Sequence, residues 1–75
     1  MPSLRALECL VAIADTGSIT QAARLLRLSQ PAVSHQLSML EREAQTILFL
    51  REARGLKLTP AGRAAVGDAR QAIDA

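Results

Sequence analysis

Amide and hydroxyl side chains recur every four residues between positions 30 and 38. Gln30, Ser34 and Ser38 have this spacing, which places them on one face of a helix. A glutamine amide can pair with adenine through two hydrogen bonds, and a serine hydroxyl can bind a base edge or a phosphate. Pro31 and His35 lie beside them, and the stretch contains no acidic residue. The face suits hydrogen bonding to a polyanion, although an ordinary amphipathic helix with a solvated face has the same pattern.

The positive charge of the chain is concentrated in its middle. The formal net charge is +2, but residues 24–63 hold seven basic residues against three acidic ones, and the segments on either side each carry a net charge of −1. Arg51, Arg54 and Lys57 lie close together within this part. A basic stretch in a small domain favours a nucleic-acid partner, and a solvated charged surface is the alternative.

The chain offers little for catalysis or metal binding. Its one His and one Cys are far apart in sequence, and we find no nucleotide-binding loop, zinc-ligand spacing or nucleophile motif. We therefore expect no catalytic residue, no metal site and no cofactor. His35 is interpreted as a neutral imidazole that contacts nucleic acid or faces solvent. Cys9 is expected to be a small, partly buried apolar residue.

Composition excludes several other classes of protein. The longest stretch without a charged residue has 13 residues and is rich in Ser and Gln, whereas a membrane span needs about 20 apolar residues. No apolar segment of a secretory signal is found near the N-terminus, and a single Cys suits a reducing cytoplasm. Phe49 is the sole aromatic residue, so recognition of RNA by stacking is disfavoured.

The hydrophobic spacing predicts four helices that hold these side chains. The first spans about 4–15 and the second about 19–26, the third follows Ser29, and the fourth starts at Pro60. Each has a Ser or Thr as predicted N-cap, namely Ser3, Ser18, Ser29 and Thr59. Ser18 and Gln21 also fit a capping box. The fourth helix is still running at Ala75, so we expect the chain to stop inside a longer helix.

Apolar residues three and four apart predict the buried side of each helix. The predicted residues are Leu4, Leu7, Leu10, Val11 and Ala14, then Ala22, Ala23, Leu25 and Leu26, then Val33, Leu37, Leu40 and Ala44, and finally Ala61, Ala65, Val66, Ala69, Ala72 and Ile73. The alanines of the fourth helix allow close approach of another helix. A monomer would leave Val66 and Ile73 poorly covered, so we predict a symmetric dimer paired along this helix.

Between the third and fourth helices the pattern becomes that of a β-hairpin. Ile47–Leu50 is short, apolar and β-prone, and Leu56–Leu58 alternates as a strand does. Gly55 gives the intervening turn its conformational freedom. Two helices joined by a short link and followed by a basic hairpin form the layout of a winged helix-turn-helix, in which the second helix of the pair enters the major groove.

Several motifs of the chain resemble a known family. They are Gly17–Ala23, Leu26, Ser29–Ser34, Leu40-Glu41, Leu48-Phe49 and Leu58–Gly62. Together they resemble the N-terminal DNA-binding domain of LysR-type bacterial transcriptional regulators, over nearly the whole chain. The run Ser-Gln-Pro-Ala-x-Ser, followed by Leu-Glu and Leu-Phe, is more specific than a generic helix-turn-helix pattern. The sequence departs from the family at His35, Gln45 and Ile47, where Arg, Gly and Pro are common.

The resemblance implies a mainly α fold, with a winged helix-turn-helix and a two-stranded β wing over 1–59 and the start of a linker and dimerisation helix over 60–75. It places Gln30, Pro31, Ser34 and His35 on the DNA-facing surface, to which the helical spacing adds Ser38, and it places Arg51, Arg54 and Lys57 on the wing. The predicted dimer contacts are Ala65, Val66, Ala69 and Ile73. A small-molecule effector would bind only through a domain that this chain lacks.

The sequence therefore predicts sequence-specific binding of double-stranded DNA by a homodimeric LysR-type regulator in the cytoplasm, with no enzyme activity and no membrane. The alternative is a helical protein-interaction module that uses the apolar face of the C-terminal helix. The two hypotheses differ in salt dependence, because a DNA binder loses affinity with a log–log slope of about 0.9 per neutralised phosphate. An apolar helix interface should barely respond to salt.

Overall fold

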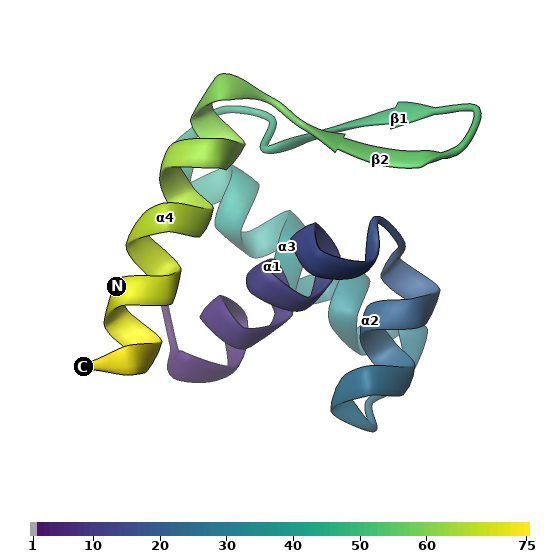
Figure 1. Ribbon diagram of the computed structural model, residues 1–75, viewed down its shortest axis with the longest axis horizontal. Helices are drawn as coiled ribbons and strands as arrows, with labels where there is room; N and C mark the ends of the chain where they lie inside the picture. The colour runs from purple at the N-terminus through teal and green to yellow at the C-terminus, as the bar shows by residue number, and fades with distance from the viewer. Residues whose placement is uncertain (1) are drawn as a thin grey trace.

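The computed structural model describes residues 2–75 and contains four helices and one two-stranded sheet (Figure 1). The helices are α1 (Leu4–Thr16), α2 (Ile19–Leu26), α3 (Gln30–Ala44) and α4 (Pro60–Asp74), and the antiparallel strands are β1 (Phe49–Glu52) and β2 (Gly55–Leu58). The mainly α winged helix-turn-helix predicted from the sequence is confirmed. No helix within the described part of the chain is both long enough and apolar enough to span a bilayer.

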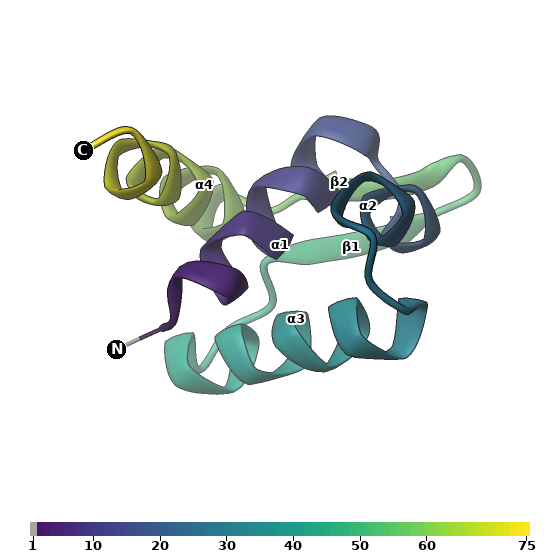
Figure 2. The ribbon, with the colours of Figure 1, turned by 90° about the horizontal axis from the view of Figure 1, so that it is seen from below.

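The hydrophobic core is built around α1, which contacts each of the other three helices. Figure 2 shows α1 lying between α3 and α4. Cys9, Leu10 and Ile13 of α1 are almost completely buried, and Val33 from α3 and Ala22 from α2 join them in one cluster. The periodicity that predicted these helices therefore also identified most of the residues that pack together.

Some positions predicted to face the core lie at the surface instead. These are Leu4, Leu25, Ala44 and Ala72. Leu25 has an exposed fraction of 62%. It follows Ala23 by two residues, which is about half a helical turn, so when Ala22 and Ala23 face the core Leu25 points away. On a helix as short as α2, the spacing of apolar residues indicates which side faces the core but not how much of that side the neighbouring helices cover.

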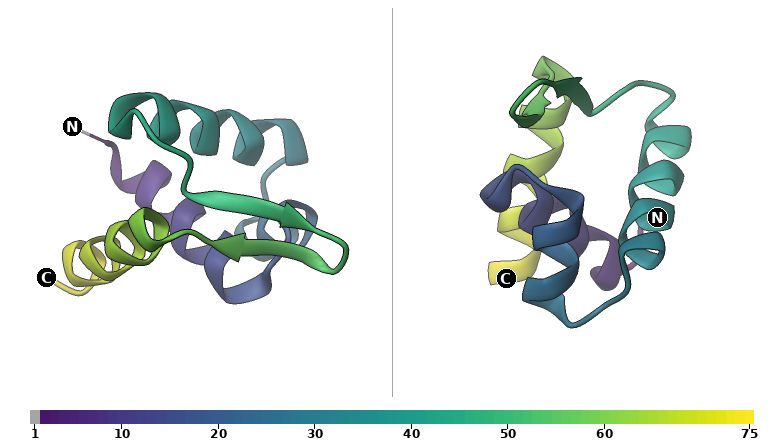
Figure 3. Two further views of the ribbon diagram at one scale, coloured as in Figure 1. Left: turned by 90° about the horizontal axis from the view of Figure 1, so that it is seen from above. Right: turned by 90° about the vertical axis from the view of Figure 1, so that its right-hand side faces the viewer.

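The wing starts two residues later than the sequence predicted. Phe49 pairs with Leu58, and the register ends at the pair Glu52 and Gly55, which leaves residues 53 and 54 as the turn. The backbone of Ile47 and Leu48 bonds to Thr59 and Glu41 instead of to β2, so strand pairing begins only at Phe49. Seen from above in Figure 3, the hairpin crosses the body of the molecule with its turn beyond the helices.

α4 belongs to the same core as α1. Val66 and Ala69 have exposed fractions of only 5% and 1% within the single chain, whereas Ala65 and Ile73 are half-buried. The expectation that a monomer leaves Val66 uncovered is therefore wrong, because α4 packs along α1. The predicted domain boundary between residues 59 and 60 separates residues that belong to the same hydrophobic core. The role of 60–75 as the start of a linker and dimerisation helix stays a prediction.

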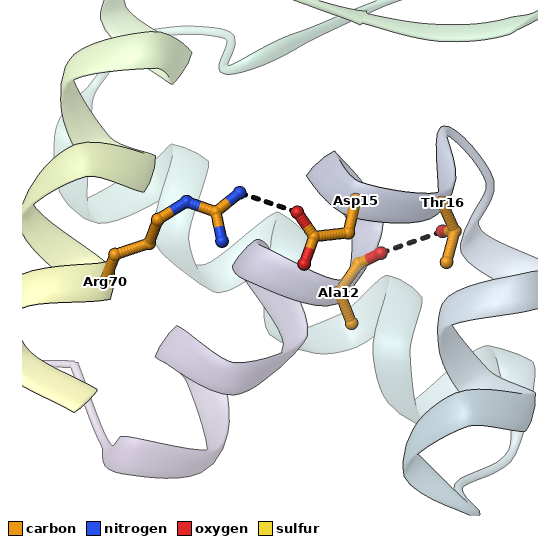
Figure 4. A network of polar contacts seen from close by, with 4 residues as sticks. All are labelled: Ala12, Asp15, Thr16 and Arg70. Carbon is orange, nitrogen blue, oxygen red and sulfur yellow. Dashed lines mark hydrogen bonds and ion pairs between the residues drawn. The ribbon is translucent and has the colours of Figure 1, made fainter. Parts of the chain in front are cut away.

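An ion pair joins α4 to the end of α1. The guanidinium of Arg70 donates to a carboxylate oxygen of Asp15 at 2.6 Å, as Figure 4 shows. Both side chains are about half exposed. This hydrogen bond raises the pKa of Arg70 above its usual value. Because exposed ion pairs are screened by solvent, the buried contacts along the two helices, more than this pair, keep α4 against α1.

All four predicted N-caps are formed. The side chains of the capping residues accept a hydrogen bond from the backbone N–H three residues later, at 2.9 to 3.2 Å, and these residues are Ser3, Ser18, Ser29 and Thr59. The capping box at Ser18 is only half formed, because the N–H of Ser18 donates to the Thr16 hydroxyl at 3.3 Å and not to the Gln21 side chain. That hydroxyl itself donates to the carbonyl of Ala12 (Figure 4).

Candidate nucleic-acid interface

The apolar stripe of α3 fixes which side of this helix faces outward. Val33, Leu37 and Leu40 are buried against the body. The predicted DNA-facing residues lie away from that stripe: Gln30, Pro31, His35 and Ser38 are exposed, and Ser34 is half-buried. The structure thus presents the amide and hydroxyl groups on successive turns of a helix whose rotation about its axis is set by its packing.

A polar cleft opens where the N-terminal end of α3 meets the wing. Its volume is about 200 Å³, and it is lined by residues of the α1–α2 turn, α2, α3 and the hairpin. Gln30 and Arg51 both line it, although they lie 21 positions apart in the sequence. The cleft also includes Ser18 and Ile19 at the start of α2, where the helix dipole favours negative charge. Glu52 also lines the cleft, so its lining holds one basic and one acidic side chain among polar groups.

The three basic side chains of the wing do not act as one cluster. Side chains alternate between the two faces of a strand, so Arg51 shares a face with Phe49, which packs into the core. Lys57 pairs with Leu50 on the opposite face, and Arg54 lies in the turn. The structure therefore brings Arg51 to the cleft beside Gln30 and places Lys57 on the other side of the hairpin.

The wing is fastened to the α1–α2 turn near its own turn. The N–H of Leu56 donates to the carbonyl oxygen of Gly17 at 3.1 Å. Gly55 has a φ of 115°, and a Cβ at this position would lie 2.6 Å from the same oxygen. Sequence analysis assigned Gly55 to the turn but missed this close approach, since nothing local in the sequence marks a contact with Gly17.

A second feature that the sequence did not predict is the role of Glu41. Its Oε2 atom accepts hydrogen bonds from the backbone N–H groups of Leu48, at 2.7 Å, and Phe49, at 3.5 Å. The carboxylate thereby links the last turn of α3 to the start of the wing. The Leu40-Glu41 motif was the available signal, but spacing alone does not show what Glu41 binds.

The titratable groups outside this surface carry no reactive arrangement. Cys9 is completely buried, more than predicted, and burial raises the pKa of its thiol, an effect that nearby Arg5 opposes. The ion pairs Arg5–Glu8 and Arg70–Asp15 lie on α1 and α4, away from α3 and the wing. Within residues 2–75, no group of three or more His, Cys, Asp and Glu side chains is placed to hold a metal ion.

Comparison with known proteins relates the chain to bacterial transcriptional regulators. Residues 4–63 match the model of the bacterial regulatory helix-turn-helix protein, lysR family. The HTH-type transcriptional regulator TfdS of Cupriavidus pinatubonensis is 46% identical over 70 residues, which cover 93% of this chain and 24% of TfdS. The chain thus spans about a quarter of the length of that relative.

Two solved structures share the fold closely. CbnR_DBD in its DNA complex superposes with a TM-score of 0.90 at 36% identity, covering 96% of this chain and 83% of that one. BenM_DBD in complex with catB site 1 DNA gives a TM-score of 0.90 at 35% identity, covering 96% and 81%. Since the family model covers most of the chain and both the sequence and the fold agree with it, the chain belongs to the lysR family of bacterial regulatory helix-turn-helix proteins.

Proposed function

We propose that this chain is the DNA-binding domain of a bacterial LysR-type transcriptional regulator and that it binds double-stranded DNA sequence-specifically, without catalysing a reaction. The observation that carries the proposal is the outward, acid-free face of α3 next to a basic wing. The DNA complexes of CbnR_DBD and BenM_DBD, which have the same fold, support it. The cytoplasm, where bacterial chromosomes lie, is the expected location.

In this proposal the two parts of the surface have different tasks. Gln30 and Ser34 contact base edges in the major groove, with Pro31, His35 and Ser38 beside them on α3. A glutamine can read adenine through two hydrogen bonds, whereas a serine discriminates less. Arg51, Arg54 and Lys57 contact phosphates or the narrow minor groove. Phosphate contacts set position and affinity but carry no sequence information.

We also propose that two copies pair along α4, and that an effector acts only through a part of the regulator outside this chain. A mainly apolar groove of about 410 Å³ between α1, α3 and α4 supports the pairing, because Leu7, Leu40, Ala65 and Ala72 line it, with Glu43 and Asp68 also in its lining. Since Val66 and Ala69 are buried in the chain's own core, we expect the contacts to come from Ala65 and Ala72, which line the groove, and from the half-buried Ile73. Sedimentation at DNA-binding concentrations should give the mass of a dimer.

The salt dependence of DNA binding tests the main proposal. Duplexes selected from a random library serve as probes, and unselected duplexes serve as the reference. We expect tighter binding to the selected duplexes and a log–log salt slope of about 0.9 for each phosphate neutralised. Equal affinity for both pools, or a slope near zero, would contradict the proposal and favour the protein-interaction module.

A further inference from the structure

We propose that Glu41 is a positioning residue that sets the wing relative to α3, at a junction where α4 is fastened as well. The junction consists of Glu41, Leu48, Thr59 and Gly62. The inference rests on the proposed DNA-binding function, because its consequence is that base contacts from α3 and phosphate contacts from the wing can form together.

The first half of the junction joins α3 to the chain that enters the wing. Leu48 is buried, so its N–H cannot bond to water and needs a partner within the protein. That partner is the Glu41 carboxylate, at 2.7 Å. A hydrogen bond to an ionised acceptor is about twice as strong as one between neutral groups. The same oxygen also receives the N–H of Phe49, the first residue of β1.

The second half joins the same segment to the start of α4. The N–H of Thr59 donates to the carbonyl oxygen of Leu48 at 3.0 Å, and its hydroxyl donates to the carbonyl oxygen of Ile47 at 2.8 Å. That hydroxyl accepts the N–H of Gly62 as the cap of α4. A Cβ at Gly62 would overlap the Leu48 carbonyl oxygen, so only glycine allows this approach.

One residue therefore connects three elements. The N–H of Leu48 is held by α3 and its carbonyl oxygen by the start of α4, and the wing begins at the next residue. Glu41 lies about 16 Å along the axis of α3 from Gln30, too far to share its base contact. We expect Glu41 to influence DNA binding through the position of the wing, which starts at the residue after Leu48, and a change in the direction of α4 would reach the wing through Leu48 as well.

Two conservative substitutions of Glu41 separate the effect of side-chain length from the effect of its charge. Glu41→Asp keeps the charge but withdraws the carboxylate by one methylene, whereas Glu41→Gln keeps an oxygen acceptor at full reach and loses the charge. We expect Glu41→Asp to speed hydrogen exchange of the Leu48 amide about tenfold relative to the Val33 amide. Its affinity for selected and unselected duplexes alike should fall about fivefold, the equivalent of one hydrogen bond, because the phosphate contacts of the wing carry no sequence information. Glu41→Gln should stay closer to wild type in both measurements.

A matched control is Glu8→Asp, which shortens a carboxylate on α1 away from the junction and should change neither quantity. If neither Glu41→Asp nor Glu41→Gln speeds exchange of the Leu48 amide, the carboxylate does not hold the junction, and the proposal is overturned. It is also overturned if Leu48 exchange accelerates while the affinity for both duplex pools stays at the wild-type value, since Glu41 is then purely structural. If wild type binds no duplex, the DNA-binding proposal fails, and the exchange data report separately on the junction.

Discussion

The recognition helix α3 and the wing carry candidate DNA contacts of the same surface, but they are held in place in different ways. Helix α3 buries Val33, Leu37 and Leu40 in the core. This packing fixes the rotation of α3 about its own axis and its distance from the other helices. The strands of the wing bury only Phe49, and the hairpin is attached at Gly17 and at Leu48. Base contacts carry the sequence information, whereas phosphate contacts set position and affinity. The difference in anchoring therefore parallels the proposed division of labour.

Removing an anchor of α3 should have the largest effect. Leu37→Ala deletes a buried side chain and leaves a cavity, so we expect a loss of about 2–5 kcal/mol in the free energy of unfolding. Leu56→Ala in the wing should cost clearly less, because Leu56 is only half-buried. Urea unfolding followed by circular dichroism measures both. If the two variants lose the same stability, the wing is as much a part of the core as α3, and the comparison fails.

Loosening the wing at its second attachment should have an intermediate effect. Gly55→Ala combines an unfavourable positive φ with a Cβ against the Gly17 carbonyl oxygen, and we expect a cost of about 1–3 kcal/mol with weaker binding to every duplex. Gly17→Ala is the control, because Gly17 has a φ of 71° but no atom within 4 Å of an added Cβ. It should lose less stability than Gly55→Ala. The reverse order would show that the contact at Gly17 does not fasten the wing.

Substituting one proposed DNA contact in α3 and one in the wing should have the smallest effect on the structure and should show directly which of the two reads the sequence. Gln30→Ala should lower affinity for selected duplexes by about 1–3 kcal/mol and leave unselected duplexes nearly unaffected. Arg54→Ala should weaken both and reduce the salt slope by about one. Competition binding at two salt concentrations measures both variants. If Gln30→Ala weakens both duplex pools equally, α3 is not the element that reads the sequence.

The parts of the fold that depend on local chemistry could be predicted from the sequence. Ser29 caps α3 through the N–H three residues later, and Pro60 starts α4, because both effects act within a single turn. The outward position of Gln30 followed from the apolar spacing of the same helix. These predictions needed no knowledge of which elements lie next to one another.

The parts that failed or were missed depend on contacts between distant segments. Val66 was expected to be covered by a second copy of the chain, because periodicity does not tell which helix covers an apolar stripe. In the structure Val66 is buried within the single chain, where α4 packs along α1. Ile47 was expected in a strand, but Thr59 binds its carbonyl oxygen, and its side chain is 56% exposed. The partners of Glu41 lie beyond the end of its own helix, so no helical pattern could reveal them.

Because Cys9 is buried, the rate at which its thiol is labelled reports how often the core opens. A thiol reagent attacks the thiolate, and burial both shields the sulfur and raises its pKa, so the folded chain should be labelled only when α1 separates from its neighbours. Cys9 is the sole cysteine of a chain that has no tryptophan or tyrosine, so its modification gives an unambiguous mass signal. Any duplex that binds the folded state must slow this labelling by mass action. The affinity for a duplex can therefore be obtained from how much the duplex lengthens the time that Cys9 stays unlabelled. Mass spectrometry measures this time without an added chromophore.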